Sequence, residues 1–469
     1  MSKIKFGTDG WRSKIADTFT VSNVARVTHA VALWLLNKNR EPSVVVGYDT
    51  RFGGKLFAET VAKVLGSKGI KVYLSNEYVS TPEVSYGITW YDASLGIVIT
   101  ASHNSYEYNG YKLKGEYGGP LLEDQIKNIE DLITDDFEVD LDLIKWNLLV
   151  DQKLIETVDL ESIYIEKVKS YFNLDKIAGS KYRFVFDAMY GSGQRVMKKL
   201  LPKVKNLHCT PDPLFNSIPP EPLEKNLGDI LQLMGSSRDY DCGLVVDGDA
   251  DRLALVNSKG EYTDTHNVFL LLIHCLVKYR KDSGKVVAGY SSTSRVEKLC
   301  RHYGLETQRV KIGFKEICSI MLKENVMIGG EESGGIAVRN HIPERDGIWS
   351  GLTIWQFMAE TNKSLEELIQ EVIDITGPFC CSRNDIEVNK DQQFRIFEKC
   401  RKNGYTSFGE VKVDRREVFD GYKYFLSDDD WVLIRPSGTE PKIRIYADSG
   451  SEEFTKFLLN SVTETLLNT

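Results

Sequence analysis

Short runs of β-branched and other apolar residues recur along this chain, and each run ends in a polar or glycine-rich turn. Such runs predict buried strands, and they occupy residues 44–49, 96–100, 183–187, 243–247 and 326–329. Apolar residues at helical spacing lie between them, for example Phe57, Val61, Val64 and Leu65. Because strand and helix alternate, we predict an α/β fold with largely parallel sheets. Ligands bind beyond the carboxyl ends of the strands in such sheets, which is where the polar turns fall.

The chain after about residue 378 has a different pattern. Apolar and polar residues alternate at 386–388, 411–413 and 443–445, which is typical of strands with one exposed face. A closing helix is predicted from an apolar face made of Phe454, Phe457, Leu458 and Val462. This last segment is therefore predicted to be a separate α+β domain.

A chain of 469 residues holds three or four domains at the usual size of about 100–200 residues. Candidate boundaries lie in the acidic stretch 135–142, just after the turn 247–252, and at residues 375–378, Ile-Thr-Gly-Pro. The predicted domains are three α/β units and one α+β unit, at residues 1–145, 146–256, 257–376 and 377–469.

Composition excludes several classes of protein. The 59 basic and 67 acidic residues give a net charge of −8, which argues against a nucleic-acid partner held by bulk electrostatics. No apolar run approaches the ~18 residues that span a bilayer, and the amino terminus lacks a signal-peptide core. Eight cysteines without a CxxC pair indicate reduced thiols. We expect a cytoplasmic monomer or homodimer without a membrane partner.

The first segment suited to chemistry is Thr100-Ala101-Ser102-His103-Asn104, which directly follows a predicted strand. The hydroxyl of Ser102 can face a ligand there, and backbone N–H groups near a following helix start could hold an anion. His103 and Lys112 supply groups for proton transfer if they converge in space. The alternative is that Ser102 only caps a helix.

The second segment, Asp247-Gly248-Asp249-Ala250-Asp251-Arg252, follows another predicted strand. Three carboxylates at alternate positions of a tight loop offer the hard oxygen ligands that Mg²⁺ prefers. An EF-hand would need glycine and glutamate at positions taken here by Arg252 and Ser258, so calcium buffering is disfavoured. A solvated acidic turn is the alternative.

Three further segments combine polar side chains with glycines, which let the backbone approach a ligand closely. Glu331-Glu332-Ser333-Gly334-Gly335 can bind sugar hydroxyls, or it is a flexible turn. The segment 435–441, Arg-Pro-Ser-Gly-Thr-Glu-Pro, combines a guanidinium with two hydroxyls as phosphate cradles do, and Arg444 adds a second cation. The alternative is a Pro-Gly turn in a hairpin. Arg12 follows Gly7-Thr8-Asp9-Gly10 and could reach a phosphate.

These five segments, in this order from residue 6 to about 446, resemble the α-D-phosphohexomutase superfamily of phosphoglucomutases and phosphomannomutases. The resemblance implies four domains around a central cleft, the first three with mixed, mostly parallel sheets. It also implies an enzyme that interconverts hexose 1-phosphate and hexose 6-phosphate with Mg²⁺. The reaction would pass through a phosphoserine and a hexose 1,6-bisphosphate.

The resemblance also implies residue roles. Ser102 would donate and re-accept the phosphoryl group, and it would bind Mg²⁺ through that group together with Asp247, Asp249 and Asp251. Lys112, His103, Arg12 and Arg252 would surround the reacting phosphate, with Lys112 as the better acid/base candidate. Glu331 and Ser333 would recognise the sugar. The phosphate that does not react would be held by Arg435, Ser437, Gly438, Thr439 and Arg444.

Two positions depart from the family pattern. Ser105 stands where proline is frequent, and Gly335 stands where several members have a histidine that could act as a second acid/base. Phosphate contacts from the segment 311–315, with Lys315, could compensate for that histidine. The version of the sugar loop in this chain favours glucose and mannose phosphates. The alternatives are a phosphoglucosamine mutase, a sugar-phosphate-binding protein without catalysis, and a serine phosphatase.

Overall fold

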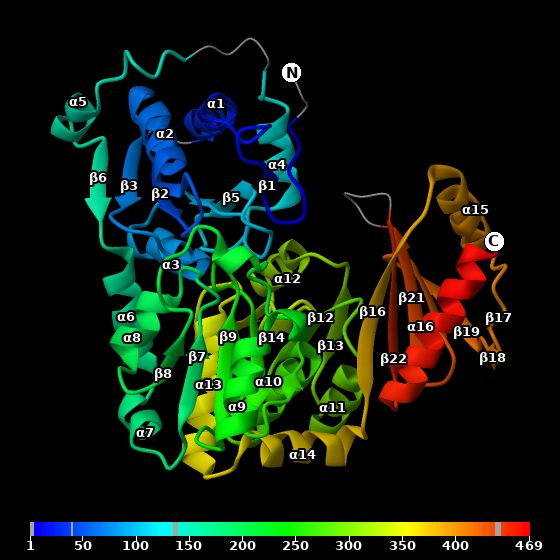
Figure 1. The fold of residues 1–469 in the computed structure, drawn as a ribbon. Helices are drawn as coiled ribbons and strands as arrows, with labels where there is room; N and C mark the ends of the chain where they lie inside the picture. Colours follow the sequence, from blue (N-terminus) through cyan, green and yellow to red (C-terminus); the bar gives the residue numbers. More distant parts are fainter. Residues whose placement is uncertain (1–3, 39–40, 135–138, 437–441) are drawn as a thin grey trace.

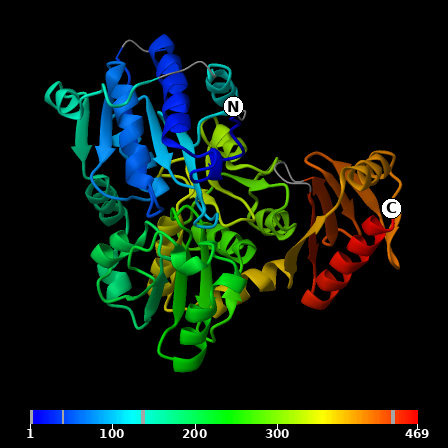
Figure 2. The same cartoon turned by 45° about the horizontal axis from the view of Figure 1, so that its top comes forward.

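The computed structural model describes residues 4–38, 41–134, 139–436 and 442–469. Within these ranges the strands form four main sheets in chain order and one small two-stranded sheet. The first three sheets and their helices make one body, while the fourth sheet and α16 stand to one side of it (Figures 1 and 2).

The first sheet has the strand order β1-β5-β4-β2-β3-β6. It is mixed, because β5 runs antiparallel to β1 and β4 whereas β2, β3, β4 and β6 are parallel. Its strands are β1 (Trp11–Lys14), β2 (Ser43–Tyr48), β3 (Lys71–Ser75), β4 (Leu95–Ile99), β5 (Tyr108–Gly115) and β6 (Ile155–Val158). Its helices are α1 (Val21–Lys38), α2 (Gly54–Ser67), α3 (Thr81–Trp90), α4 (Glu123–Glu130) and α5 (Trp146–Asp151).

The second sheet has the order β11-β10-β9-β7-β8, with β7, β8 and β9 parallel and β10 antiparallel to its neighbours. Its strands are β7 (Phe184–Asp187), β8 (Lys205–Leu207), β9 (Cys242–Val246), β10 (Leu253–Asn257) and β11 (Tyr262–Thr263). The α-helices here are α6 (Leu160–Tyr171), α7 (Leu174–Ala178), α8 (Gln194–Leu200) and α9 (Gly228–Ser237). Two short 3₁₀ helices are η1 (Phe215–Ser217) and η2 (Glu224–Asn226).

The third sheet has the order β13-β12-β14-β15, with only β15 antiparallel to its neighbour. Its strands are β12 (Lys285–Gly289), β13 (Thr307–Val310), β14 (Val326–Gly330) and β15 (Ile336–Val338). Its helices are α10 (Thr265–Lys278), α11 (Arg295–Tyr303), α12 (Phe314–Met321), α13 (Gly347–Thr361) and α14 (Leu365–Thr376). One cluster of buried apolar side chains, which includes Phe186, Leu244, Leu271 and Trp355, joins the second and third sheets into a single core.

The fourth sheet is antiparallel throughout, in the order β16-β22-β21-β20-β19. Its strands are β16 (Cys380–Glu387), β19 (Arg415–Val418), β20 (Tyr422–Phe425), β21 (Trp431–Pro436) and β22 (Lys442–Ser449). The small sheet pairs β17 (Ser407–Phe408) with β18 (Val411–Lys412). The helices are α15 (Lys390–Arg401) and α16 (Glu452–Leu467), the second of which includes the predicted closing helix.

The predicted fold class, three α/β domains and a C-terminal α+β domain, is confirmed. The five predicted strands correspond to β2, β4, β7, β9 and β14. The exact boundaries stay predictions; β6 lies within the range 146–256 but pairs with β3 of the first sheet. The expectation of a helix start after Ser102 was wrong, because the antiparallel strand β5 follows that turn.

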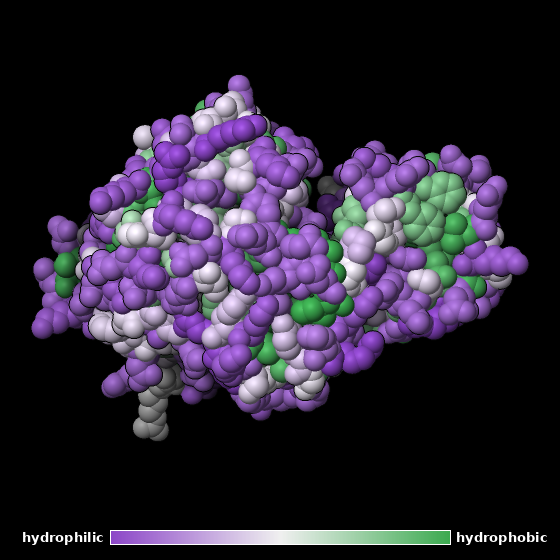
Figure 3. Space-filling model, turned by 90° about the horizontal axis from the view of Figure 1, so that it is seen from below, coloured by the Kyte–Doolittle hydropathy of each residue, from purple (hydrophilic) through white to green (hydrophobic). Residues whose placement is uncertain are grey.

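The surface seen from below is mostly hydrophilic, with separate hydrophobic patches and a hollow between the main body and the smaller lobe of the fourth sheet (Figure 3). Across the described ranges, none of the helices has both the length and the apolar character that a bilayer span requires.

Candidate active site

Ser102 occupies the turn between β4 and β5 with a φ of 53°. A residue with a side chain adopts this left-handed conformation at a cost of about 1–2 kcal/mol. The Ser102 side chain is buried, and its Oγ lies 2.8 Å from Oδ2 of Asp247 and 3.4 Å from Nδ1 of His103. The turn therefore presents the hydroxyl to the aspartate loop.

Arg51, just beyond β2, holds this turn in place. Its guanidinium donates hydrogen bonds to four carbonyl oxygens of the turn, at 2.5–3.2 Å from Ser102, Asn104, Ser105 and Tyr108. Arg51 is itself paired with Asp49 at 3.1 Å, and both side chains are fully buried. Burial raises the pKa of Asp49 to about 6, although the charge of Arg51 opposes this rise.

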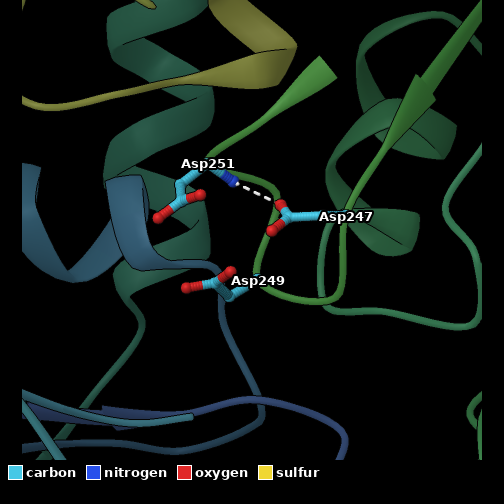
Figure 4. A group of neighbouring side chains, drawn as sticks. All are labelled: Asp247, Asp249 and Asp251. Carbon is cyan, nitrogen blue, oxygen red and sulfur yellow. Dashed lines mark hydrogen bonds between the residues drawn. The ribbon is translucent and has the colours of Figure 1, made fainter. Parts of the chain in front are cut away.

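Asp247, Asp249 and Asp251 lie on the loop between β9 and β10, and their carboxylates gather around one space (Figure 4). Each offers one oxygen to a set of atoms that lie within 4.8 Å of one another. Oδ1 of Asp249 and Oδ1 of Asp251 are buried and have no hydrogen-bond partner among the described residues. Because a buried carboxylate oxygen without a partner is costly, these residues fit a divalent cation with oxygen ligands such as Mg²⁺.

Lys112 of β5 brings a positive charge to the same loop. Its Nζ lies 2.7 Å from Asp249, 3.0 Å from Asp251 and 2.7 Å from Asp9. Burial by itself lowers the pKa of Lys112, but the three carboxylates outweigh it and raise that pKa above its ordinary value. Burial raises the pKa of Asp247 well above its usual range, and the charges of Asp249 and Asp251 add to this rise.

Arg12, His103 and Arg252 surround the Ser102 turn. Arg12 donates to Oδ1 of Asn104 at 2.8 Å, and Arg252 lies 3.6 Å from Glu221. His103 faces the same Glu221 at 3.9 Å. Burial and then the charges of Arg252 and Arg12 hold the pKa of His103 well below its usual value. The structure thus brings all the residues predicted around the reacting group to one place.

Glu331 follows β14, and its Oε1 accepts a hydrogen bond from the N–H of Gly313 at 2.9 Å. Burial raises the pKa of Glu331 to about 7, against the charge of Arg345. Ser333 is half-buried on the same loop. Lys315, predicted as a phosphate contact, donates to the carbonyl oxygen of Gly7 at 3.1 Å, so it ties α12 to the amino-terminal segment.

Arg435 and Arg444 are direct partners on the antiparallel strands β21 and β22. Arg435 pairs with Asp420 at 3.1 Å, and Asp420 also accepts from the N–H of Ile312 at 2.8 Å. Nε of Arg444 is buried and has no hydrogen-bond partner within the described ranges. Residues directly opposite each other on antiparallel strands point to the same face of the sheet, so Arg435 and Arg444 place two cations on one face, which suits an anion. Ser437, Gly438 and Thr439, predicted as part of this site, lie outside the described residues.

Sequence reasoning missed several residues that complete the site. Lys114, Glu344 and Arg345 are buried charged groups, and Lys114 pairs with Glu344. Arg345 contacts both Asp9 and Asp251. The signal for Lys114 was present, because residues two apart on a strand share a face and Lys112 and Lys114 are two apart. Arg345 gave no such signal, since it stands in an ordinary Glu-Arg-Asp triplet.

The fold and the site define a protein of three α/β domains and one α+β domain, with a hydroxyl group beside a carboxylate loop that fits a metal ion. Four family models match the chain, namely the phosphoglucomutase/phosphomannomutase alpha/beta/alpha domains I (residues 3–140), II (162–260) and III (264–375) and the C-terminal domain (397–462). The chain therefore belongs to the phosphoglucomutase/phosphomannomutase family, within the α-D-phosphohexomutase superfamily, and is an isomerase of this type.

Individual relatives agree on the family but not on the sugar. A phosphoglucomutase/phosphomannomutase of Thermococcus kodakarensis is 30% identical over 453 residues, which are 96% of this chain and 95% of the relative. A phosphoglucosamine mutase of Methanococcus maripaludis is 29% identical over 97% of both chains. A crystal structure from Thermus thermophilus, described as that of a phosphomannomutase, is 31% identical and has a TM-score of 0.87 over 99% of both chains.

Proposed function

We propose that this chain interconverts the 1-phosphates and 6-phosphates of glucose and mannose, with Mg²⁺ and through a phosphoserine at Ser102. The observation that carries the proposal is the contact between Oγ of Ser102 and Asp247, at 2.8 Å. The pairing of Arg435 with Arg444 across β21 and β22 supports it, because two cations on one face of the sheet offer a second phosphate site. A mutase that works through a bisphosphate needs one site for the reacting phosphate and one for the other phosphate.

The transfer has two balanced halves. In the first half, the bond from phosphorus to Oγ of phosphorylated Ser102 breaks, and phosphorus bonds to the free hydroxyl oxygen of the sugar monophosphate. The proton of that hydroxyl passes through a neighbouring base to the released Oγ. The product is a hexose 1,6-bisphosphate, which turns so that its other phosphate faces Ser102. The reverse transfer re-forms the phosphoserine and releases the isomeric monophosphate.

Asp247, Asp249 and Asp251 would hold Mg²⁺, which when bound supplies positive charge against the phosphoryl oxygens. Fixed cations around Ser102 stabilise the same charge, which phosphoryl transfer requires more than covalent activation. These cations are Lys112, Arg12 and Arg252. Nδ1 of His103 lies 3.4 Å from Oγ of Ser102, and this distance supports a role for His103 in holding the transferred proton at that atom. Lys112 is shared by three carboxylates, and this arrangement supports a charge role for it.

The choice of sugar rests on the loop of Glu331 and Ser333, whose carboxylate and hydroxyl can bind sugar hydroxyls. The loop ends in Gly335, the form that favours glucose and mannose phosphates. The second candidate function is a phosphoglucosamine mutase, which the name and the 29% identity of the Methanococcus maripaludis relative favour.

The test is a side-by-side turnover assay with the 1-phosphates of glucose, mannose and glucosamine, each with glucose 1,6-bisphosphate as activator. We expect kcat/KM for glucose and mannose phosphates to exceed that for glucosamine phosphate by at least about tenfold. The reverse order would establish the glucosamine function instead. Ser102→Ala should abolish all three activities, while Ser105→Ala, on the same turn, should retain them. Turnover by Ser102→Ala at the wild-type rate would overturn the phosphoserine mechanism.

A further inference from the structure

Position 335 requires a glycine because of a neighbouring side chain and not because of its own backbone conformation. Its φ is not in the left-handed region, so an ordinary residue could adopt this conformation. A Cβ atom at 335 would, however, lie only 2.2 Å from Cδ and 2.9 Å from Cγ of Arg345. The side chain of Arg345 therefore fills the space that a side chain at position 335 would need.

Arg345 has little freedom to move out of this space. It is 3% exposed, and its guanidinium lies 5.5 Å from the centre of the Phe314 ring. Nη2 contacts Oδ2 of Asp251 at 2.6 Å and also pairs with Asp9. Nη1 lies 3.9 Å from Oε2 of Glu331. The guanidinium thus lies between a carboxylate of the metal-binding loop and one of the sugar-recognition loop.

The backbone joins the same two loops. The N–H of Leu253 donates to the carbonyl oxygen of Gly334 at 3.2 Å, and Arg252 and Gly335 form an isolated antiparallel bridge. Arg345 bonds Oδ2 of Asp251, while Oδ1 is the buried oxygen that has no hydrogen-bond partner among the described residues. Oδ2 is held by Arg345 at 2.6 Å and by Nζ of Lys112 at 3.0 Å, and Oδ1 is left for a cation.

We infer that Arg345 is a positioning residue that orients Asp251 toward the metal and couples the metal-binding loop to Glu331 in the sugar-recognition loop. Position 335 is a glycine to make room for it. A residue that orients a metal ligand typically changes metal affinity by about 10–100-fold when it is replaced. The inference rests on the proposed function in taking Asp251 as a ligand of Mg²⁺ and Glu331 as a contact of the sugar.

The test measures Mg²⁺ binding by titration calorimetry, without sugar and without turnover. Gly335→Ala is expected to raise the Mg²⁺ dissociation constant at least about tenfold, because the added methyl group displaces Arg345. Gly228→Ala is the matched control, since a Cβ atom there meets nothing within 4 Å. Arg345→Ala should weaken binding to the same degree, and adding Gly335→Ala to it should change nothing further.

The inference would be overturned if Gly335→Ala bound Mg²⁺ as tightly as the wild type. It would also be overturned if the double variant raised the Mg²⁺ dissociation constant by the product of the two single effects. If Arg345→Ala does not fold, Arg345→Lys takes its place. The single ammonium group of lysine cannot contact both Asp251 and Glu331. Both the Mg²⁺ dissociation constant and the KM for sugar phosphate should therefore rise. Wild-type values for both would contradict the inference. Asp251→Asn separates the two proposals, because unchanged Mg²⁺ binding in that variant would refute the metal site itself.

Discussion

The hydroxyl group of Ser102 donates a hydrogen bond to a carboxylate oxygen of Asp247, although the two residues are 145 positions apart. Ser102 follows a strand of the first sheet, and Asp247 follows a strand of the second. The candidate nucleophile and the candidate metal loop therefore meet only when the first two sheets are packed together. Anything that loosens this contact is expected to affect both groups at once.

Arg51 provides a prediction about the stability of the Ser102 turn. Arg51→Met removes the cation that is paired with the fully buried Asp49, so the free energy of unfolding should fall by about 3–5 kcal/mol in urea denaturation. The control is Lys71→Met, which breaks a pair with Glu156 that is 38% and 50% exposed and should cost less than about 1 kcal/mol. A loss in Arg51→Met as small as in the control would contradict the assigned role.

Metal binding should be visible as stabilisation of the folded protein. A ligand present at 100 times its dissociation constant raises the free energy of unfolding by about 2.7 kcal/mol, and we expect Mg²⁺ to do so here in denaturation experiments. Asp249→Asn should remove most of this gain, because it removes one of the three carboxylates of the loop. Asp239→Asn, an exposed aspartate that pairs with Arg183, is the control and should keep the gain. Equal gains in both variants would rule out this loop as the metal site.

The buried amine of Lys423 in β20 leads to a prediction about how the free energy of unfolding depends on pH. Its Nζ donates to the carbonyl oxygen of Tyr290 at 2.6 Å, and its side chain is 4% exposed. Burial, and then the charge of Arg309, lower its pKa to about 7, while Glu297, Asp448 and Glu417 act in the opposite direction. An unfolded chain keeps this proton up to its ordinary pKa of 10.5.

The contribution of Lys423 is therefore fully present above pH 10.5 and is lost as the pH falls to about 7. Urea denaturation between pH 7.5 and 9 should show a rise with pH to which Lys423 adds about 1.4 kcal/mol per pH unit. In Lys423→Met, the free energy of unfolding should rise less steeply with pH, by the contribution of Lys423. Lys412→Met, at an exposed position, should show the same pH dependence as the wild type. An unchanged slope in Lys423→Met would show that the buried amine stays charged.

Replacement of Arg444 tests the proposed second phosphate site. Its buried Nε lacks a hydrogen-bond partner among the described residues, so a phosphate group should gain a charge-assisted bond there. Such a bond is worth about 1.5–3 kcal/mol, and Arg444→Met should raise the KM for sugar phosphate by about 10–150-fold. Arg401→Met, an exposed cation of α15, should leave the KM unchanged. A wild-type KM in Arg444→Met would remove this residue from the substrate site.

The sequence was informative wherever the chemistry is local. The aspartate loop and the Ser102 turn each follow a β-branched strand, and the carboxyl ends of strands are where ligands bind in such sheets. Both features could be read from a few consecutive residues. The strands themselves were equally clear, because short runs rich in β-branched residues and bounded by turns, such as 243–246, are typical of buried strands.

The remaining parts of the site depend on contacts between distant residues. Arg345 reaches Asp251 across 94 positions, and Arg51 reaches the Ser102 turn across 51. Neither arginine has a local pattern that distinguishes it from a surface charge. The antiparallel strand after Ser102 was missed for a similar reason, since Asn109 and Gly110 favour a turn and β5 is formed only by pairing with β1 and β4.

The central claim is that Ser102 carries the transferable phosphoryl group. Intact mass measurement of the purified protein, before and after a chase with glucose 6-phosphate, tests it most directly. The account predicts an added mass of about 80 Da that maps to Ser102, is absent from Ser102→Ala and is removed by the sugar phosphate. A protein that turns over sugar phosphates while never carrying this mass, or while carrying it on another residue, would contradict the account.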